Sequence, residues 1–343
     1  MKRIVFILSL VLTLPSLAAS LPKAQRLSIW GIPAANYSGL TPFGEGRYAV
    51  VSDKEPLDGF YVWQIVQDRQ TGQVSYVVNR GYKGQVPLDT NTDGISLRDA
   101  EDIVWCPQRH SFFVCGEGYQ DIVEMDMEGQ RTGYELPIPD YLRNIYPNYG
   151  FESLAYDSVS QTFYTITENV LPADGAPTSS LNRVAATLHL QTFRPSAKPG
   201  TDGKLQFEAG DKFEYQMDMP RATRLGRSLT HGVVAVTALG GGKLAVLERE
   251  AYVAQAFTGS WVWNKLYVVD TNVPAGTMLT KQFVTQWDTH LRLTEYNWAN
   301  YEGMCLGQPL PDGRQTLILI SDSQGGYGLG PAHLQDYIRV VIL

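Results

Sequence analysis

Acidic residues recur at both ends of short apolar segments in this chain, and paired carboxylates can bind hard cations or transfer protons. The clearest example is the segment Glu101–Glu117, which reads EDIVWCPQRHSFFVCGE. Its apolar arms, Ile103–Trp105 and Ser111–Cys115, flank the turn sequence Pro107–His110, a pattern typical of a β-hairpin. Because the outer ends of a hairpin lie side by side, we expect the two terminal glutamates to be neighbours.

The same design occurs in four more segments, each with apolar arms and turn-forming residues near its centre. These segments are Ser38–Asp53, Glu152–Glu168, His231–Glu248 and Glu302–Asp322. Further β-type stretches follow each one, so the chain reads as repeated antiparallel units of four strands. Such repetition is typical of a β-propeller. We therefore predict an all-β fold, a single propeller of five blades, or six if the third or fourth unit contains another. The alternative is a pair of β-sandwiches or another all-β fold.

The two ends of the chain are expected to meet in one blade. The last unit ends in the strand Tyr337–Ile342 and lacks one strand, while a strand around Leu27–Gly31 has no partner at the other end. Pairing them would close the ring and remove its free sheet edges.

In a propeller the first strand of each blade lies nearest the axis, so the acidic ends of the segments should gather at one mouth of the central channel. The expected set is Asp53, Glu101, Glu117, Glu152, Glu168, Glu248, Glu302 and Asp322. Bare carboxylates at this density would repel one another. They could be compensated by backbone N–H groups and arginines, by a hard cation such as Ca²⁺, or by a cationic or polyhydroxylated ligand.

Three long segments leave the hairpins at the same acidic end, namely Asn169–Arg183, Arg249–Asn264 and Ser323–Asp336. Long loops on one face of a rigid scaffold usually carry a binding site. Their aromatic residues would form the walls of a ligand site or cap the channel; they are Tyr252, Phe257, Trp261, Trp263 and Tyr327. His231 replaces an acidic residue at a repeat position and is a candidate general base.

Residues 1–19 have a basic start, an apolar run and small residues before the end, which is typical of a secretory signal peptide. We expect residues 20–343 to form one exported domain, periplasmic or secreted, without a membrane span. The chain has a net charge of −7 and no Lys/Arg cluster, which argues against nucleic acid and anionic membranes as partners. A monomer is the default expectation.

Common catalytic motifs are absent: the sequence has no GxSxG elbow, HExxH helix or Walker A loop. Three cysteines, Cys106, Cys115 and Cys305, allow at most one disulfide. Cys106 and Cys115 are not directly opposed across the hairpin, so we do not expect them to be bonded.

At these residues the chain resembles the phytase-like family of secreted proteins, described by the phrase "esterase-like activity of phytase". The similarity covers nearly all of the mature chain and depends on short stretches in a fixed order. They are Ser38-Gly39-Leu40 with Ser52-Asp53, Asp99–Glu101 with Gly116-Glu117-Gly118, Asn148–Leu154 with Thr167-Glu168, Leu247-Glu248-Arg249, Asn300–Gly303 with Pro311–Arg314, and Ser321-Asp322. The chain departs from the family pattern where Ser323-Gln324 stands in place of the expected Asp-Asn.

The resemblance implies a propeller fold and hydrolysis of phosphoesters or esters. Acidic residues cannot bind phosphate directly, so a phosphohydrolase of this kind would need Ca²⁺ ions that bridge to phosphate and activate water. They would be held by Glu101, Glu117, Glu152, Glu168, Glu302 and Asp322. Arg249 would then neutralise charge in the transition state. The competing hypothesis is a non-catalytic propeller whose acidic, aromatic-rimmed mouth binds a carbohydrate, a peptide or a cation. Under either hypothesis the expected partner is a small-molecule or glycan ligand.

Overall fold

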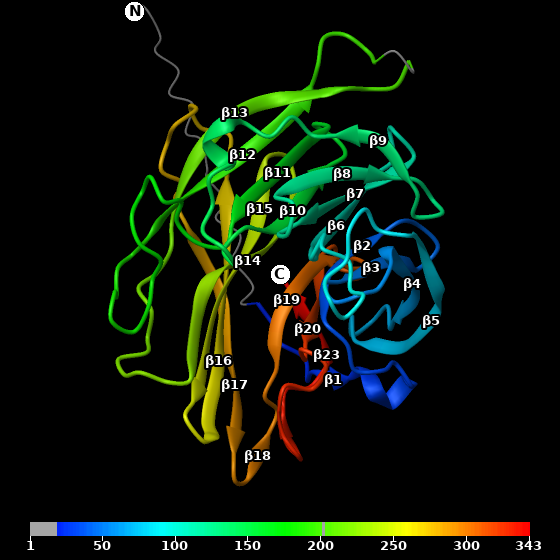
Figure 1. Ribbon diagram of the computed structural model, residues 1–343. Helices are drawn as coiled ribbons and strands as arrows, with labels where there is room; N and C mark the ends of the chain where they lie inside the picture. The colour runs from blue at the N-terminus through cyan, green and yellow to red at the C-terminus, as the bar shows by residue number, and fades with distance from the viewer. Residues whose placement is uncertain (1–18, 201–202) are drawn as a thin grey trace, which may run out of the picture.

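The computed structural model describes residues 19–200 and 203–343. The predicted signal peptide, residues 1–19, lies outside the described residues except for Ala19. The described strands form five sheets around a central axis and one short pair, β21 (Gly328–Leu329) with β22 (Ala332–His333), so the fold is a five-bladed β-propeller (Figure 1). This confirms the predicted fold class and decides the number of blades. Among the described residues, no helix has the length and apolar character needed to cross a membrane.

Each blade is an antiparallel sheet, and in blades one to four the strands follow the order of the chain outward from the axis. Blade one contains β2 (Tyr37–Pro42), β3 (Arg47–Ser52), β4 (Asp58–Gln67) and β5 (Val74–Gln85). Blade two contains β6 (Ala100–Cys106), β7 (Ser111–Gly116), β8 (Asp121–Met125) and β9 (Arg131–Glu135). Blade three contains β10 (Phe151–Asp157), β11 (Thr162–Thr167), β12 (Thr187–Pro195) and β13 (Phe207–Gln216). Blade four contains β14 (Ser228–Gly240), β15 (Lys243–Ala254), β16 (Phe257–Asp270), β17 (Gln282–Arg292) and the short β18 (Glu295–Tyr296).

Both ends of the chain meet in blade five, as the sequence predicts. Its order is β19 (Asn300–Leu306), β20 (Thr316–Asp322), β23 (Tyr337–Ile342) and β1 (Gln25–Arg26). The predicted strand around Leu27–Gly31 is wrong, because Leu27–Trp30 forms a 3₁₀ helix, η1. Gly31 ends this helix at a φ of 73°, a left-handed conformation that glycine adopts without steric cost. The closing strand is the pair of residues just before it.

The core is divided into apolar layers between neighbouring blades. The inner strands β2, β6, β10, β14 and β19 contact one another around the axis. Phe60 and Phe112, with ring centroids 4.6 Å apart, join blades one and two, and Leu188 and Val246 belong to the layer between blades three and four. Because both faces of a blade are buried, its second strand is a largely apolar run, as in Ser111–Gly116 (β7) and Thr316–Asp322 (β20).

Every inner strand has a β-bulge, which lies near the start of the strand in all but the longer β14. The register shifts between Tyr37 and Gly39, Ala100 and Asp102, Phe151 and Ser153, Val233 and Ala235, and Tyr301 and Gly303. The bulged residues are therefore Ser38, Glu101, Glu152, Val234 and Glu302. A bulge changes the direction of the side chain that it carries. Three glutamates, Glu101, Glu152 and Glu302, therefore change direction at equivalent positions of three blades.

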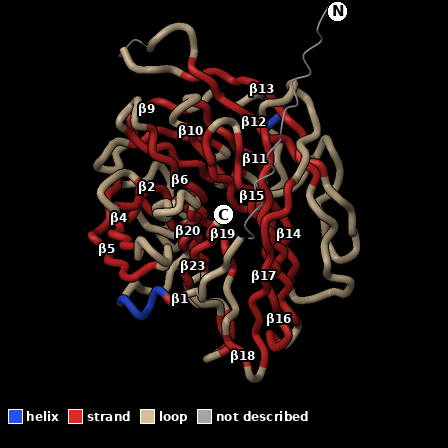
Figure 2. The backbone as a smooth tube through the Cα atoms, turned by 180° about the vertical axis from the view of Figure 1, so that it is seen from behind, coloured by secondary structure: helices blue, strands red, loops and turns tan. Residues whose placement is uncertain are grey.

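The long strands of blade four continue beyond the ring and end at β18 (Figures 1 and 2). The predicted loop Arg249–Asn264 is therefore wrong. Most of it belongs to β15 and β16, which are joined by a turn at Gln255 and Ala256. All three cysteines are buried free thiols.

Candidate functional site

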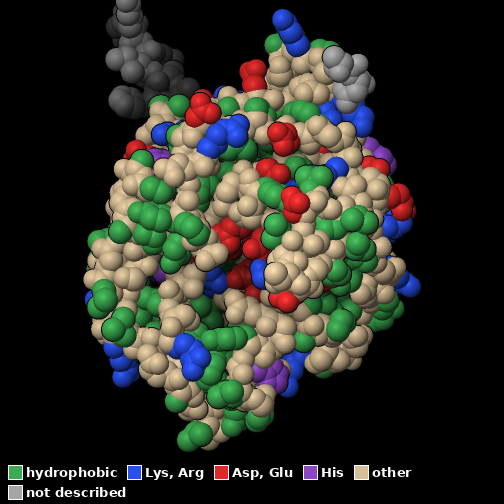
Figure 3. Space-filling model, in the orientation of Figure 1, with side chains coloured by type: hydrophobic (Ala, Val, Ile, Leu, Met, Phe, Trp, Pro, Cys, Tyr) green, Lys and Arg blue, Asp and Glu red, His purple; other side chains and the backbone are tan. Residues whose placement is uncertain are grey.

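Acidic side chains gather in a hollow at the centre of one face of the molecule, with basic side chains at its edge (Figure 3). The residues of this cluster, which we call the acidic mouth, lie where the inner strands begin. They are Asp53, Asp99, Glu101, Glu117, Glu152, Glu168, Glu302 and Asp322. Seven of the eight carboxylates predicted from the sequence are thus brought together.

Two positions that repeat around the ring supply most of this mouth. The first is the bulge on the inner strand, which provides Glu101, Glu152 and Glu302. The second lies on the neighbouring strand. The last inner-strand residue before the bulge pairs with a residue of that strand, and the next residue along it takes the position. It is occupied by Asp53, Glu117, Glu168, Arg249 and Asp322.

Glu248 does not join the acidic mouth. It pairs with Val233, one residue before the equivalent position, and a shift of one residue on a strand reverses the direction of a side chain. Its carboxylate instead accepts hydrogen bonds from Tyr215 Oη at 2.8 Å and from Lys281 Nζ at 2.7 Å. Arg249 takes the mouth position in blade four.

The acidic mouth contains two groups of three carboxylates. One oxygen from each of Glu101, Glu117 and Glu152 lies within 4.8 Å of the other two, and the same holds for Asp53, Asp99 and Glu101. Glu101 belongs to both groups. Glu117 accepts a hydrogen bond from the backbone N–H of Gly150 at 2.7 Å.

Burial and mutual repulsion raise the pKa values of these groups. Burial is the largest cause for Glu101, whose pKa rises well above its ordinary value, and the charges of Glu152 and Asp53 raise it further. Burial also raises the pKa of Glu152, and Glu168 and Glu302 add to the effect. A bound cation would favour the charged carboxylates and reverse these shifts.

Arg249 is held between two acidic residues of the mouth, Glu168 and Glu302. Its Nη1 donates to Glu302 Oε1 at 2.6 Å and to Asn300 Oδ1 at 2.8 Å, and its Nη2 donates to Glu168. Burial raises the pKa of Glu168 and Arg249 lowers it, with a net rise to about 7. Arg249 itself is 4 % exposed, so its charge acts in a largely water-free setting.

Sequence reasoning missed Asp99 and Lys54 as members of the site. Lys54 Nζ forms ion pairs with Asp53 Oδ2 at 2.8 Å and with Asp99. Asp99 has a φ of 54°, an uncommon conformation for a residue other than glycine. Lys54 directly follows Asp53, and Asp99 precedes Glu101 by two residues, so closeness in the sequence was the available signal.

A pocket of about 270 Å³ adjoins Arg249. Arg249 and Asn300 line it where it meets the mouth, and Tyr327, Trp298 and Leu334 add aromatic and apolar surface. Among the described residues, Arg249 Nε and Trp298 Nε1 are buried donors without a hydrogen-bond partner. Tyr327 is therefore placed beside the site, as the sequence predicts, whereas Trp298 was missed.

The other predicted aromatic residues lie elsewhere. Tyr252 pairs with Trp261, and Trp263 pairs with Glu250, so all three share the face of the sheet opposite to that of Arg249. Tyr252 and Trp261 stack with centroids 5.5 Å apart, and the guanidinium of Arg221 lies over Trp261 at 5.2 Å. Phe257 contacts Tyr327 edge-on.

His231 lies on this same opposite face, where it pairs with Glu250. The ring is 1 % exposed, and its Nδ1 lies 3.0 Å from the hydroxyl of Thr178. Burial lowers the pKa of His231 to about 3, and the charges of Lys265 and Arg249 contribute. The imidazole is therefore neutral and turned away from the mouth, so the geometry does not support a general-base role.

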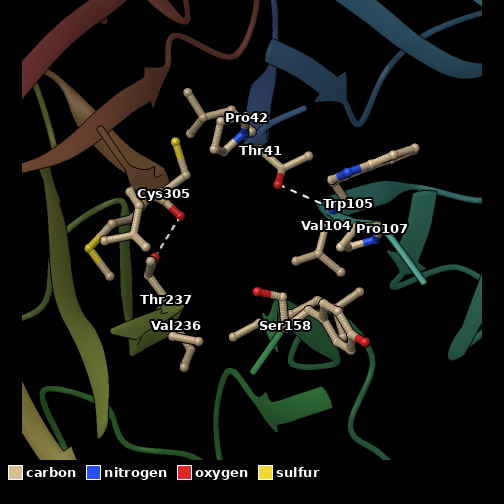
Figure 4. Close-up of a pocket in the computed structure, with 16 residues that line it drawn as sticks. Thr41, Pro42, Val104, Trp105, Pro107, Ser158, Val236, Thr237 and Cys305 are labelled. Carbon is tan, nitrogen blue, oxygen red and sulfur yellow. Dashed lines mark hydrogen bonds between the residues drawn. The ribbon is translucent and has the colours of Figure 1, made fainter. Parts of the chain in front are cut away.

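The other end of the channel has a different character. A pocket of about 200 Å³ there is lined from all five inner strands, by Leu40, Val104, Leu154, Val236 and Met304 among others (Figure 4). Two hydroxyls in it are already engaged, since Thr41 accepts from the N–H of Trp105 and Thr237 donates to the carbonyl of Met304. The acidic chemistry is thus confined to one mouth.

The residues present fit a hard divalent cation. The group Glu101, Glu117 and Glu152 offers carboxylate oxygens alone, which suits Ca²⁺ or Mg²⁺ and not the softer metals that prefer Cys or His. Glu101 is 7 % exposed, and its carboxylate accepts no hydrogen bond from the described residues. A cation would be a partner for this carboxylate. Ca²⁺ tolerates the irregular geometry that strand ends provide.

Several solved structures are similar to this chain at low identity. Virginiamycin B lyase from Staphylococcus aureus with quinupristin is 11% identical, with 95% of this chain and 99% of that chain covered and a TM-score of 0.38. The PQQ-bound aldose sugar dehydrogenase from Streptomyces coelicolor is 12% identical, with 94% and 100% covered and a TM-score of 0.36. A periplasmic gluconolactonase from Pseudomonas aeruginosa is 13% identical, with 89% and 88% covered and a TM-score of 0.37.

No curated protein matches the chain at a significant level. A family model does match, over residues 32–324, and its description is "Esterase-like activity of phytase". The matched region contains all eight carboxylates of the acidic mouth and Arg249. The chain therefore belongs to the phytase-like family.

Proposed function

We propose that the acidic mouth is a calcium-dependent centre that hydrolyses phosphoesters or esters. The observation that carries the proposal is the group Glu101, Glu117 and Glu152, whose oxygens lie within 4.8 Å of one another in a largely buried setting. A cation in this group would offset their repulsion. The family description supports the reaction class, and the dependence on calcium is the part that the proposal adds.

The roles of the residues follow from their positions. Glu101, Glu117 and Glu152 would hold the ion, and Ca²⁺ when bound supplies Lewis-acid polarisation of the substrate oxygen and a water of lowered pKa. Arg249, fixed by Glu168 and Glu302, holds positive charge at the border between the mouth and the adjoining pocket. That charge can stabilise negative charge that develops on the substrate.

The pocket beside Arg249 suits the organic part of an ester. Trp298, Tyr327 and Leu334 would cover an apolar or aromatic group, while the unpartnered donors Arg249 Nε and Trp298 Nε1 can bond an oxygen. We propose export as well, as the leader in the sequence suggests, which would place the centre in compartments where calcium is plentiful.

The test is turnover of p-nitrophenyl phosphate and p-nitrophenyl acetate by purified residues 20–343, first in EDTA and then with added Ca²⁺. We expect activity only with Ca²⁺, and Glu152→Gln should raise the calcium concentration for half-maximal activity by about tenfold. Glu135→Gln is the matched control, because Glu135 is exposed on β9.

Activity that persists after complete chelation would contradict the metal-based mechanism. Thermal stabilisation by Ca²⁺ and a phosphate ester without turnover of any substrate would favour the non-catalytic binding module instead.

A further inference from the structure

The two carboxylate groups of the acidic mouth differ in one respect. The group Asp53, Asp99 and Glu101 already contains a positive charge, because Lys54 Nζ pairs with both aspartates. Among the described residues, no lysine or arginine forms an ion pair with Glu117 or Glu152. One group therefore contains an ion-paired ammonium, whereas Lys54 and Arg249 act on Glu117 and Glu152 only through their charge, without an ion pair.

The ammonium group bridges two blades, from a side chain that is 44 % exposed. Lys54 follows Asp53 directly at the end of β3, so its backbone is fixed by blade one. The carbonyl of Asp99 accepts the N–H of Glu117 at 2.9 Å, which fixes the second partner to blade two. Burial lowers the pKa of Lys54, but the two carboxylates outweigh burial and raise it overall, so the ammonium stays charged.

Glu101 joins the two groups. Its side chain is more than nine-tenths buried, accepts no hydrogen bond from the described residues, and lies within 4.8 Å of the oxygens of both groups. Two cation sites that share one carboxylate form the arrangement of a two-metal centre, in which the ions lie about 4 Å apart. In this chain, a lysine ammonium stands in one of the two sites.

We propose that Lys54 is a tethered cation that takes the place of a second metal ion, so that the protein binds one divalent ion, at Glu101, Glu117 and Glu152. This inference rests on the metal centre of the proposed function. Removing the ammonium would leave Asp53, Asp99 and Glu101 as an open site of oxygen ligands. The protein would then bind two ions.

The test is the number of Ca²⁺ ions bound, measured by isothermal titration calorimetry and by equilibrium dialysis on residues 20–343 stripped with EDTA. We expect one ion for the unaltered chain and two for Lys54→Met. Lys54→Arg, which keeps a positive charge, should bind one. Lys83→Met is the matched control and should also bind one, because Lys83 pairs with the exposed Glu128 outside the mouth. Adding Asp99→Asn to Lys54→Met should remove the second ion.

One ion in both the unaltered chain and folded Lys54→Met would overturn this inference and leave the metal centre intact. No ion in either protein would overturn both. If Lys54→Met does not fold, a crystal of the unaltered chain soaked in Tb³⁺ decides the matter. Anomalous density at Glu117 and Glu152, with Lys54 still on Asp53, supports the proposal, whereas Tb³⁺ that displaces the Lys54 ammonium overturns it.

Discussion

Arg249 occupies in blade four the position that an acidic residue holds in the other four blades. This exchange brings a buried positive charge within hydrogen-bond distance of Glu168 and Glu302. Breaking a buried ion pair by removing one partner is costly because the other partner keeps an uncompensated charge. Arg249 therefore stabilises the mouth in addition to any role toward a substrate.

We predict that Arg249→Met lowers the free energy of unfolding by about 3–5 kcal/mol at pH 8. The loss should be smaller at pH 5, because the pKa of Glu168 is already raised to about 7 and its protonation removes the uncompensated charge. Urea unfolding at both pH values measures the difference. Arg194→Met is the control, since Arg194 and its partner Asp211 are exposed and such pairs contribute about 0–1 kcal/mol. An equal loss at pH 5 and pH 8 would contradict the argument.

At the scale of the elements, the hairpins could be predicted because turn residues and apolar arms are local signals. The ends of the hairpins are predicted correctly in four blades, and the predicted residues Asp53, Glu117, Glu168 and Asp322 lie in the mouth. In blade four the register was off by one residue, so Glu248 was chosen in place of Arg249. Register depends on pairing across the sheet, and a bulge adds a residue that the sequence does not mark.

The aromatic residues show a second limit of the same kind. Tyr252 and Trp263 were assigned to a loop because the stretch is long and contains Gly259, yet β15 and β16 continue through it as a hairpin. On a strand the side chains alternate between faces, so their direction is fixed by the pairing and not by distance along the chain. The sequence shows that these aromatic residues are close together, but it does not show which face of the sheet in blade four carries them.

The closing strand is the element whose removal tests the ring. β1 pairs with β23, and Ser20 exchanges two backbone hydrogen bonds of 2.9 Å with Ile342. We predict that a chain beginning at Leu27 loses roughly 1 kcal/mol of stability for each of these hydrogen bonds. It should also self-associate, because the edge of β23 becomes free to pair with another molecule.

Urea unfolding and size-exclusion chromatography measure the two effects of this truncation. Lys23→Ala is the control, because it removes an exposed side chain and keeps the backbone pairing. A truncated chain that is monomeric and as stable as the longer one would show that β1 does not hold the ring closed.

At the scale of the whole molecule, the acidic mouth links stability to pH. Burial raises the pKa of Asp53 to about 7 although Lys54 lowers it, and the pKa values of Glu101, Glu117, Glu152, Glu168, Glu302 and Asp322 are raised as well. A carboxyl group with a raised pKa binds more protons in the folded chain than in the unfolded chain. Stability therefore falls as the pH rises from the unfolded pKa, near 4, through the folded pKa. His231 acts in the opposite direction below pH 6.5. Burial also raises the pKa values of Asp102, Asp121, Glu250 and Asp336, which adds to the fall. The lowered pKa values of Glu124 and Asp218 act only below about pH 4.

We predict that the melting temperature in EDTA falls between pH 5 and pH 8, and that Ca²⁺ removes most of this fall. Calcium binds the charged carboxylates, so its effect should be small at pH 5 and large at pH 8, where a hundredfold excess over its dissociation constant adds about 2.7 kcal/mol. Calorimetry at four pH values, with and without Ca²⁺, measures both trends. In the variant Glu101→Gln/Glu152→Gln the fall should be shallower and Ca²⁺ should have little effect, because two of the repelling charges and two metal ligands are gone. Profiles that coincide with and without Ca²⁺ in the unaltered chain would mean that the carboxylates are compensated by protons alone, and that the mouth is an acidic channel and not a metal centre.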